Sequence, residues 1–225
     1  MTVFTLWFED VPGLTIAAAL LGLAWGFASD RIGARWPAHE DGSIRRMDWR
    51  TILVTLTGGV AFAATVARFE SSPAELFVIG AYVVALVLLF ATDLDQRLLP
   101  DVITLPLVVL ALAAFATGSG PFVHSPEDLA WAAAAAVLVP LALFLLAIPF
   151  GAGAIGQGDL KLLVSVGLLA GAANLFYSLV SGALLAGVVV ALLVFSRRIS
   201  MKSYVPYGPF LIAGTLWAIL VLQQP

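Results

Sequence analysis

Charged side chains make up only 11% of this chain, so the few carboxylates beside apolar segments are the first candidates for chemistry. Asp93 ends one apolar run and Asp159 begins another. Two carboxylates brought close together share a proton and titrate as a pair. The ionised member can take a proton from water while the protonated member polarises a peptide carbonyl, as in an aspartic-protease dyad. We therefore treat Asp93 and Asp159 as a candidate catalytic pair.

Other catalytic chemistries find little support in the composition. The chain has no cysteine, which excludes thiolate nucleophiles, disulfides and cysteine-based zinc sites. Its two histidines, His39 and His124, are far apart in the sequence, so we expect no metal site and no cofactor. The net charge of −3 and the lack of a basic patch argue against a nucleic-acid partner.

The charged residues near the pair have both functional and structural interpretations. Asp95 could be a solvated loop charge or a support for the site. Asp101 directly follows Pro100 and suits the first turn of a helix, which favours a structural role. Lys161 either extends to the membrane–water interface or tunes Asp159.

Glycines recur just before Asp159, at Gly151, Gly153, Gly156 and Gly158. Such a stretch can leave helical backbone angles and let an extended peptide approach closely. Irregular backbone at membrane depth is tolerated only where it lines a cavity or is buried in protein. Asp159 would then stand at the positive N-terminal end of the next helix. We expect Gly156 and Gly158 to support the site.

The elements that must position these residues are membrane-spanning helices. Hydrophobic residues make up 61% of the chain and the mean hydropathy is +1.04, which indicates an all-α polytopic membrane protein. We expect a single membrane-embedded domain over 1–225. Segments of about 20 mostly apolar residues can cross the bilayer. Eight are predicted near 11–29, 51–67, 74–92, 100–117, 128–150, 159–171, 174–196 and 205–222.

Two of these spans need comment. The first follows Glu9 and Asp10 and not a basic stretch, so we expect a retained helix and no cleaved signal peptide. The boundary at 171–174 is the weakest, because a mere kink there would leave seven spans and move the C-terminus to the other side.

The basic residues orient the spans. With the N-terminus outside, ten of the eleven Lys and Arg residues fall inside and only Arg68 falls outside, as the positive-inside rule requires. Two crossings separate Asp93 from Asp159, so we expect both at the cytoplasmic face and at similar depth. The polar stretch 30–50 is then a short cytoplasmic loop, too small for a separate domain without a metal or disulfide.

Three segments resemble the type IV prepilin peptidases, which are bacterial membrane aspartic proteases of the Gly-x-Gly-Asp type. Thr-Asp-Leu-Asp at 92–95 with Leu-Pro-Asp at 99–101 is similar to the family's Asp-x-Asp and Pro-Asp motif. Gly-Gln-Gly-Asp-Leu-Lys at 156–161 is similar to its Gly-x-Gly-Asp-x-Lys motif, and Pro-Tyr-Gly-Pro-Phe at 206–210 to its Pro-Phe-Gly-Pro segment. More weakly, the stretch from Gly26 to Pro37 resembles a family segment ending in Arg-x-Pro.

The resemblance implies an inner-membrane hydrolase of type IV pilus assembly or protein secretion, with Asp93 and Asp159 as its catalytic aspartates. Its substrates would be prepilins or pseudopilins with a short basic leader, cleaved at the cytoplasmic side of a bundle surrounded by lipid. Asp95 and Asp101 would offer that leader an acidic surface. Many members also carry two Cys-x-x-Cys pairs between the first two spans and N-methylate the product with S-adenosylmethionine. Since 30–50 contains no cysteine, we do not expect that methylation here.

Three other interpretations start from the same residues. A transporter or channel could pass protons or cations along the boundary carboxylates, although the spans lack the ionisable residues at mid-membrane that such pathways usually have. A non-enzymatic assembly or anchoring subunit would leave the paired aspartates incidental. A presenilin-like protease shares Gly-x-Gly-Asp, but its first aspartate lies within a span, whereas Asp93 ends one.

Overall fold

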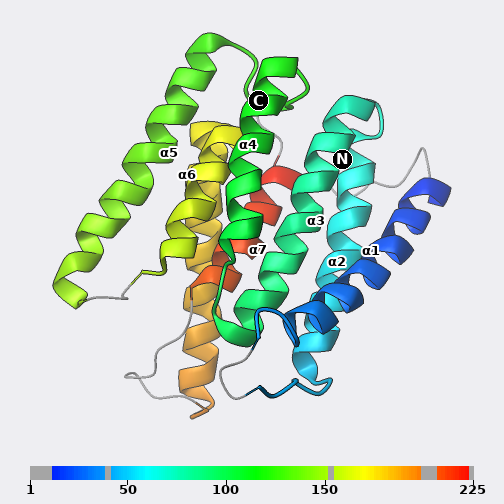
Figure 1. Ribbon diagram of the computed structural model, residues 1–225, viewed down its shortest axis with the longest axis vertical. Helices are drawn as coiled ribbons and strands as arrows, with labels where there is room; N and C mark the ends of the chain where they lie inside the picture. Colours follow the sequence, from blue (N-terminus) through cyan, green and yellow to red (C-terminus); the bar gives the residue numbers. More distant parts are fainter. Residues whose placement is uncertain (1–11, 39–41, 152–154, 199–206, 223–225) are drawn as a thin grey trace.

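The computed structural model describes residues 12–38, 42–151, 155–198 and 207–222. Within these ranges the chain forms helices and no strand, which confirms the predicted all-α class (Figure 1). Glu9, Asp10, His39 and Gly153 lie outside the described residues. The elements are α1 (Pro12–Gly33), α2 (Trp49–Phe69), α3 (Pro73–Gln96), α4 (Asp101–Thr117), α5 (Pro126–Ala147), the 3-10 turn η2 (Ile148–Phe150), α6 (Gln157–Phe195) and α7 (Gly208–Leu220).

Five of these helices, α1, α2, α3, α5 and α6, are long and apolar enough to cross a membrane. The two others, α4 and α7, are apolar but have only 17 and 13 residues. The arrangement confirms a polytopic membrane protein. The predicted sixth and seventh spans both lie in α6, which joins two helices across a break at Gly171. The count of eight spans stays a prediction.

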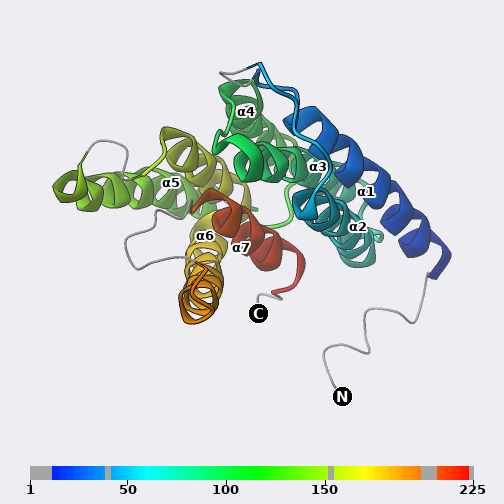
Figure 2. The same cartoon turned by 90° about the horizontal axis from the view of Figure 1, so that it is seen from below.

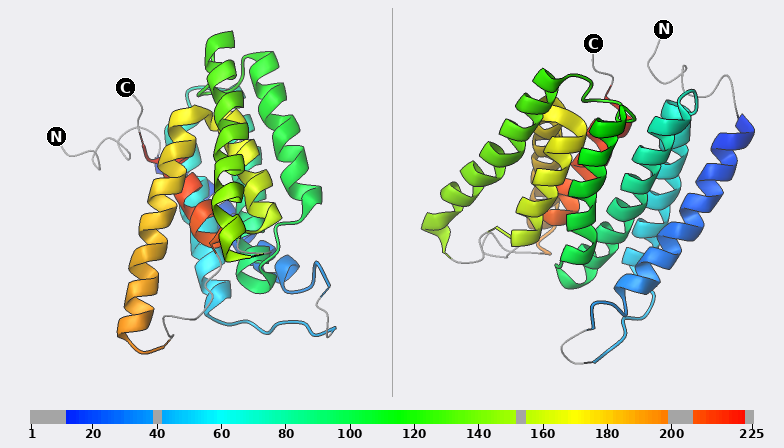
Figure 3. Two further views of the ribbon diagram at one scale, coloured as in Figure 1. Left: turned by 90° about the vertical axis from the view of Figure 1, so that its left-hand side faces the viewer. Right: turned by 45° about the horizontal axis from the view of Figure 1, so that its top comes forward.

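Gly171 interrupts α6 at the boundary that the sequence marks as weakest. Its φ of 78° and ψ of 172° are not helical. A straight helix would place Asp159 and Leu179 about 30 Å apart. The Tyr207 hydroxyl nevertheless donates to the Leu179 carbonyl at 3.2 Å, while the next residue, Gly208, lies against Asp159. The helix therefore turns back on itself at Gly171 (Figures 1 and 3).

The helix α3 contacts α1, α2, α4 and α7. Figure 2 shows it between the α1–α2 pair and α4, with α5 at the outer edge of the bundle. Tyr82, Leu86 and Leu89 on α3 are fully buried. Because its neighbours hold α3 along most of its length, the position of its last turn is fixed by packing.

The two helices that complete the site meet at small residues. A β-carbon on Gly214 of α7 would lie 2.6 Å from the Gly182 backbone nitrogen of α6. Small residues of this kind allow helix backbones to approach closely in lipid. The contact places the start of α7 inside the bundle, next to the end of α3.

The chain reverses sharply after α3. Arg97 caps α3 in the left-handed conformation with φ 57°, and its backbone N–H donates to the Asp93 carbonyl. Pro100 then precedes α4, where its lack of an N–H costs no helical hydrogen bond. This turn places Asp93 in the last turn of a helix, at one end of the bundle.

Candidate active site

Three helix ends bring the candidate catalytic residues together at one end of the bundle, which we call the carboxylate end. Asp93 lies in the last turn of α3, Asp159 in the first turn of α6, and Gly208 begins α7. A β-carbon on Gly208 would lie 2.8 Å from the Asp93 Cγ and 2.9 Å from the Asp159 Oδ1. Both carboxylates thus border one point, and their charges interact. The structure brings the pair together, and its catalytic role stays a prediction.

The two carboxylates differ in their access to solvent. Asp93 is only 4% exposed, and its Oδ2 is buried without a hydrogen-bond partner among the described residues. Asp159, at the start of α6, is partly exposed. Buried polar atoms are normally hydrogen-bonded. An oxygen such as Asp93 Oδ2 is therefore available to a proton, a water molecule or a substrate group.

The N-terminus of α7 adjoins both carboxylates. Pro209 occupies its first turn, which is the helix position that tolerates proline best. The positive end of a helix dipole stabilises nearby negative charge. Only glycine fits at 208, since any side chain would overlap the Asp93 carboxylate. From the sequence, Pro-Tyr-Gly-Pro-Phe at 206–210 was identified only as a family motif. The Gly-Pro pair within this motif was the signal that a helix begins at the site. Pro206 lies outside the described residues.

Tyr207 lies at the carboxylate end, directly before Gly208 in the chain. Its hydroxyl donates to the Leu179 carbonyl at 3.2 Å, which joins the start of α7 to the second half of α6. Burial, together with the nearby charge of Asp159, raises the pKa of the Tyr207 phenol above its ordinary value. The phenol therefore stays neutral and acts as a hydrogen-bond donor.

Asp95 does not join the Asp93–Asp159 pair. Its side chain is 2% exposed and forms ion pairs with Arg45 at 2.5 Å and with Arg50 at 3.0 Å. It is therefore not a solvated loop charge, and it is too enclosed to form part of an acidic surface. The sequence predicted Arg45 and Arg50 only as determinants of topology, and nothing in their spacing assigned them to Asp95.

Asp101 and Lys161 form an exposed ion pair across the carboxylate end. The Lys161 Nζ lies 2.7 Å from both carboxylate oxygens of Asp101. Their side chains are 56% and 36% exposed. The pair joins the first turns of α4 and α6, so Lys161 binds Asp101 and is not simply extended toward the interface.

The two supporting glycines have different surroundings. Gly156 is exposed, and its backbone lies against the Asp159 carboxylate. A β-carbon on Gly158 would lie 2.6 Å from the Leu99 Cβ. Gly158 therefore allows α6 to pack tightly on the segment that joins α3 to α4, and Gly156 leaves the approach to Asp159 open. Their role in a reaction stays a prediction.

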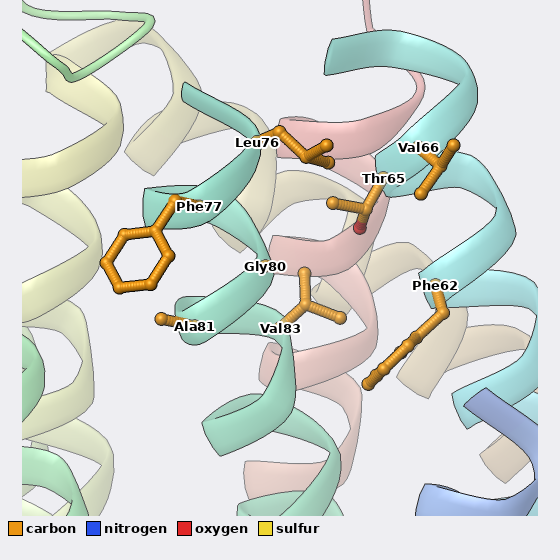
Figure 4. Close-up of a pocket in the computed structure, with 8 residues that line it drawn as sticks. All are labelled: Phe62, Thr65, Val66, Leu76, Phe77, Gly80, Ala81 and Val83. Carbon is orange, nitrogen blue, oxygen red and sulfur yellow. The ribbon is translucent and has the colours of Figure 1, made fainter. Parts of the chain in front are cut away.

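A cavity of about 340 Å³ lies between α2 and the first half of α3 (Figure 4). Asp93 is in the last turn of α3 and does not line it. The lining of the cavity is almost entirely apolar: Phe62, Thr65, Val66, Leu76, Phe77, Gly80, Ala81 and Val83. In the described part of the chain, no three His, Asp or Glu side chains gather closely enough to hold a metal ion.

A sequence model described as the type IV leader peptidase family matches residues 80–192. The match covers half of the chain and includes Asp93, Asp159 and the Asp101–Lys161 pair. The chain belongs to this family. The matched residues include most of α3, all of α4 and α5 and most of α6, whereas α1, α2 and α7 lie outside the match.

Curated relatives carry the name prepilin leader peptidase/N-methyltransferase. The protein of Burkholderia pseudomallei strain K96243 is 33% identical over 184 residues, which are 81% of this chain and 53% of the relative. That of Pseudomonas putida is 34% identical over 151 residues, covering 61% and 52%. That of Xanthomonas campestris pv. campestris is 32% identical over 145 residues, covering 62% and 48%. The chain thus spans about half the length of the curated relatives it matches. No solved structure matches it.

Proposed function

We propose that this chain is an aspartic endopeptidase that removes the basic leader from type IV prepilins or pseudopilins. The observation that carries the proposal is the meeting of the Asp93 and Asp159 carboxylates at Gly208. Both aspartates lie within the leader peptidase match, and the relatives are named for prepilin leader cleavage. The family supplies the substrate class, and the geometry supplies a chemistry that can hydrolyse a peptide bond.

The proposed reaction uses one ionised and one protonated aspartate. The ionised carboxylate takes a proton from water as the water oxygen attacks the scissile carbonyl carbon, while the protonated partner donates to the carbonyl oxygen. Collapse of the tetrahedral intermediate breaks the C–N bond; the leaving amine takes a proton from the pair, and a hydroxyl of the intermediate returns one to it as the new carboxyl group forms. The net change is the addition of one water across the peptide bond. The pair then holds one shared proton again.

The proposed setting is the bacterial inner membrane, with the carboxylate end at the cytoplasmic face. The positive-inside distribution of Lys and Arg supports this orientation. The apolar helix of the substrate would lie beside the single membrane-embedded domain, in lipid, with its leader at the carboxylate end. The reaction requires neither cofactor nor metal, and we propose neither product methylation nor a nucleic-acid partner.

Of the two aspartates expected to meet the basic leader, Asp95 and Asp101, it is Asp101 that is exposed. Asp95 is buried against Arg45 and Arg50, whereas Asp101 is bound to Lys161 at the surface. An exposed ion pair contributes little stability, so a Lys or Arg of the leader can replace Lys161 at small cost. This narrows the acidic surface expected from the sequence to one carboxylate.

The test is cleavage of a basic-leader prepilin by the protein reconstituted in lipid vesicles, followed by mass spectrometry. Asp93→Asn and Asp159→Asn should each lower kcat by at least about 10³-fold. In a group of residues that act as a unit, the loss of one member removes most of the catalytic effect. Asp101→Asn should have a much smaller effect. Thermal unfolding and size-exclusion profiles check that each variant is inserted and folded.

Two results would overturn the proposal. Retained cleavage in either folded asparagine variant would remove that aspartate from the catalytic pair. Proton or cation flux through vesicles that show no proteolysis would favour the transporter interpretation of the same carboxylates.

A further inference from the structure

A second group of charged side chains lies next to the aspartate pair. It joins the end of α1, the following loop, the start of α2 and the end of α3. We call it the charge cluster; its members are Asp30, Arg31, Arg45, Asp48, Arg50 and Asp95. Three carboxylates face three guanidinium groups, so the cluster is electrically balanced.

Arg45 is the centre of the charge cluster. Its side chain is 12% exposed and binds both deeply buried carboxylates, Asp30 and Asp95. Asp30 is 1% exposed and also accepts from the Thr51 hydroxyl at 2.8 Å. The carboxylates of Asp30, Asp95 and Asp48 raise the pKa of Arg45 despite the opposing effect of its own burial. These carboxylates therefore favour the charged form of Arg45.

A second set of contacts holds the other side of the same helical turn. The Gln96 side-chain amide donates to the Gly33 carbonyl at 3.2 Å and to the Pro37 carbonyl at 2.5 Å. A β-carbon on Gly33 would lie 3.2 Å from the Ala91 carbonyl carbon. The end of α1 and the loop that follows it thus hold the last turn of α3 in place through contacts to both Asp95 and Gln96.

This last turn of α3 also carries Asp93. Helix ends fray, because their last carbonyl groups have no partner within the helix. Asp93 and Asp95 are two residues apart, so their side chains leave the helix about 200° apart. Holding Asp95 on the Arg45 side therefore directs Asp93 to the opposite side, toward Gly208 and Asp159.

We propose that Arg45 is a positioning residue for catalysis, which acts by anchoring Asp95 and thereby setting the direction of the Asp93 carboxylate. The inference rests on the proposed peptidase function. In this proposal Asp95 helps to position Asp93 and does not contact the leader. A short loop between α1 and α2 thus takes part in the reaction through a residue that never touches the substrate.

The kinetic test compares Arg45→Gln, Asp95→Asn and the double variant with Arg46→Gln as matched control. Arg46 is the neighbouring arginine, and it is exposed. Each single variant should lower kcat for leader cleavage by about 10- to 100-fold, the cost of a small misplacement of a reacting group. KM should change by less than about twofold, because substrate binding is untouched. The double variant should be no slower than the slower single variant, and Arg46→Gln should match the wild type.

A second measurement requires no proteolysis. The chain has no cysteine, so Asp93→Cys/Asp159→Cys can be joined by a short bifunctional thiol reagent without background. Adding Arg45→Gln should lower the cross-linking yield, and adding Arg46→Gln should not. Asp93→Cys/Glu75→Cys, at opposite ends of α3, is the negative pair. If the wild type cleaves no prepilin, the proposed function fails, while the cross-link still reports on positioning.

Three outcomes would overturn the inference. A raised KM at unchanged kcat in Asp95→Asn would mean that Asp95 contacts the leader. Unchanged kcat and cross-linking in folded Arg45→Gln would mean that the charge cluster only stabilises the fold. If Arg45→Gln does not fold, Arg45→Lys replaces it, because lysine keeps the charge but fits the two carboxylates less well. A wild-type kcat and an unchanged cross-linking yield in folded Arg45→Lys would also reject the positioning role.

Discussion

The backbone of Gly208 lies against the carboxylate of Asp93, so closely that a β-carbon at 208 would be 2.8 Å from the carboxylate carbon. The same β-carbon would also approach Asp159. One glycine thus borders both carboxylates. This relationship gives a direct test of the site.

Gly208→Ala should lower kcat for leader cleavage by at least about 100-fold, because the added methyl group forces the carboxylates apart. Cleavage kinetics of the purified variant in lipid vesicles measure the effect. The matched control is Gly187→Ala on the exposed face of α6, where a β-carbon meets nothing within 4 Å. Full activity in folded Gly208→Ala would contradict the arrangement of the site.

Asp30→Ala should destabilise the fold strongly. It removes a buried carboxylate that binds Arg31, Arg45 and Thr51, and leaves the charge of Arg45 short of a partner. Breaking a buried ion pair in this way costs about 3–5 kcal/mol. Chemical unfolding in detergent, followed by circular dichroism, measures the loss.

The control for Asp30→Ala is Asp101→Ala, which breaks the exposed pair with Lys161. Surface ion pairs contribute about 0–1 kcal/mol. Equal losses in the two variants would show that the charge cluster contributes no more than a surface bridge.

Gly171→Ala should also destabilise the protein, because φ 78° with ψ 172° is a backbone region open essentially only to glycine. We expect a cost of about 1–3 kcal/mol. The nearest atoms to an added β-carbon, in Val123 and Phe122, are 3.8 Å and 3.9 Å away, so the cost is backbone strain and not a clash. Gly187→Ala should be neutral or slightly stabilising in the same assay.

Single cysteines test the orientation of the bundle. Arg46→Cys should be protected from a membrane-impermeant thiol reagent added to intact cells, and Glu127→Cys should react. The absence of native cysteine makes each signal specific to one site. The reverse pattern would place the carboxylate end on the outer face and contradict cleavage in the cytoplasm.

Much of the fold could be predicted from the sequence, because membrane helices must be long, apolar and internally hydrogen-bonded. The break near Gly171 could also be predicted, since a Gly-Ala-Ala-Asn run interrupts the apolar pattern. The reversal of the chain at Gly171 could not, because whether a glycine only kinks a helix or reverses its direction depends on what packs against both halves.

The sequence by itself determined that Asp93 and Asp159 lie on the same side of the membrane, because an even number of crossings restores the side. Only the tertiary structure decided what surrounds them. Asp93 and Asp95 belong to one helical turn, and lateral packing of α1, α2 and α7 around α3 directs the first to Gly208 and the second to Arg45. Spacing along a chain fixes the angle between two side chains on a helix, whereas the neighbours that each one meets are set by how that helix is rotated in its bundle.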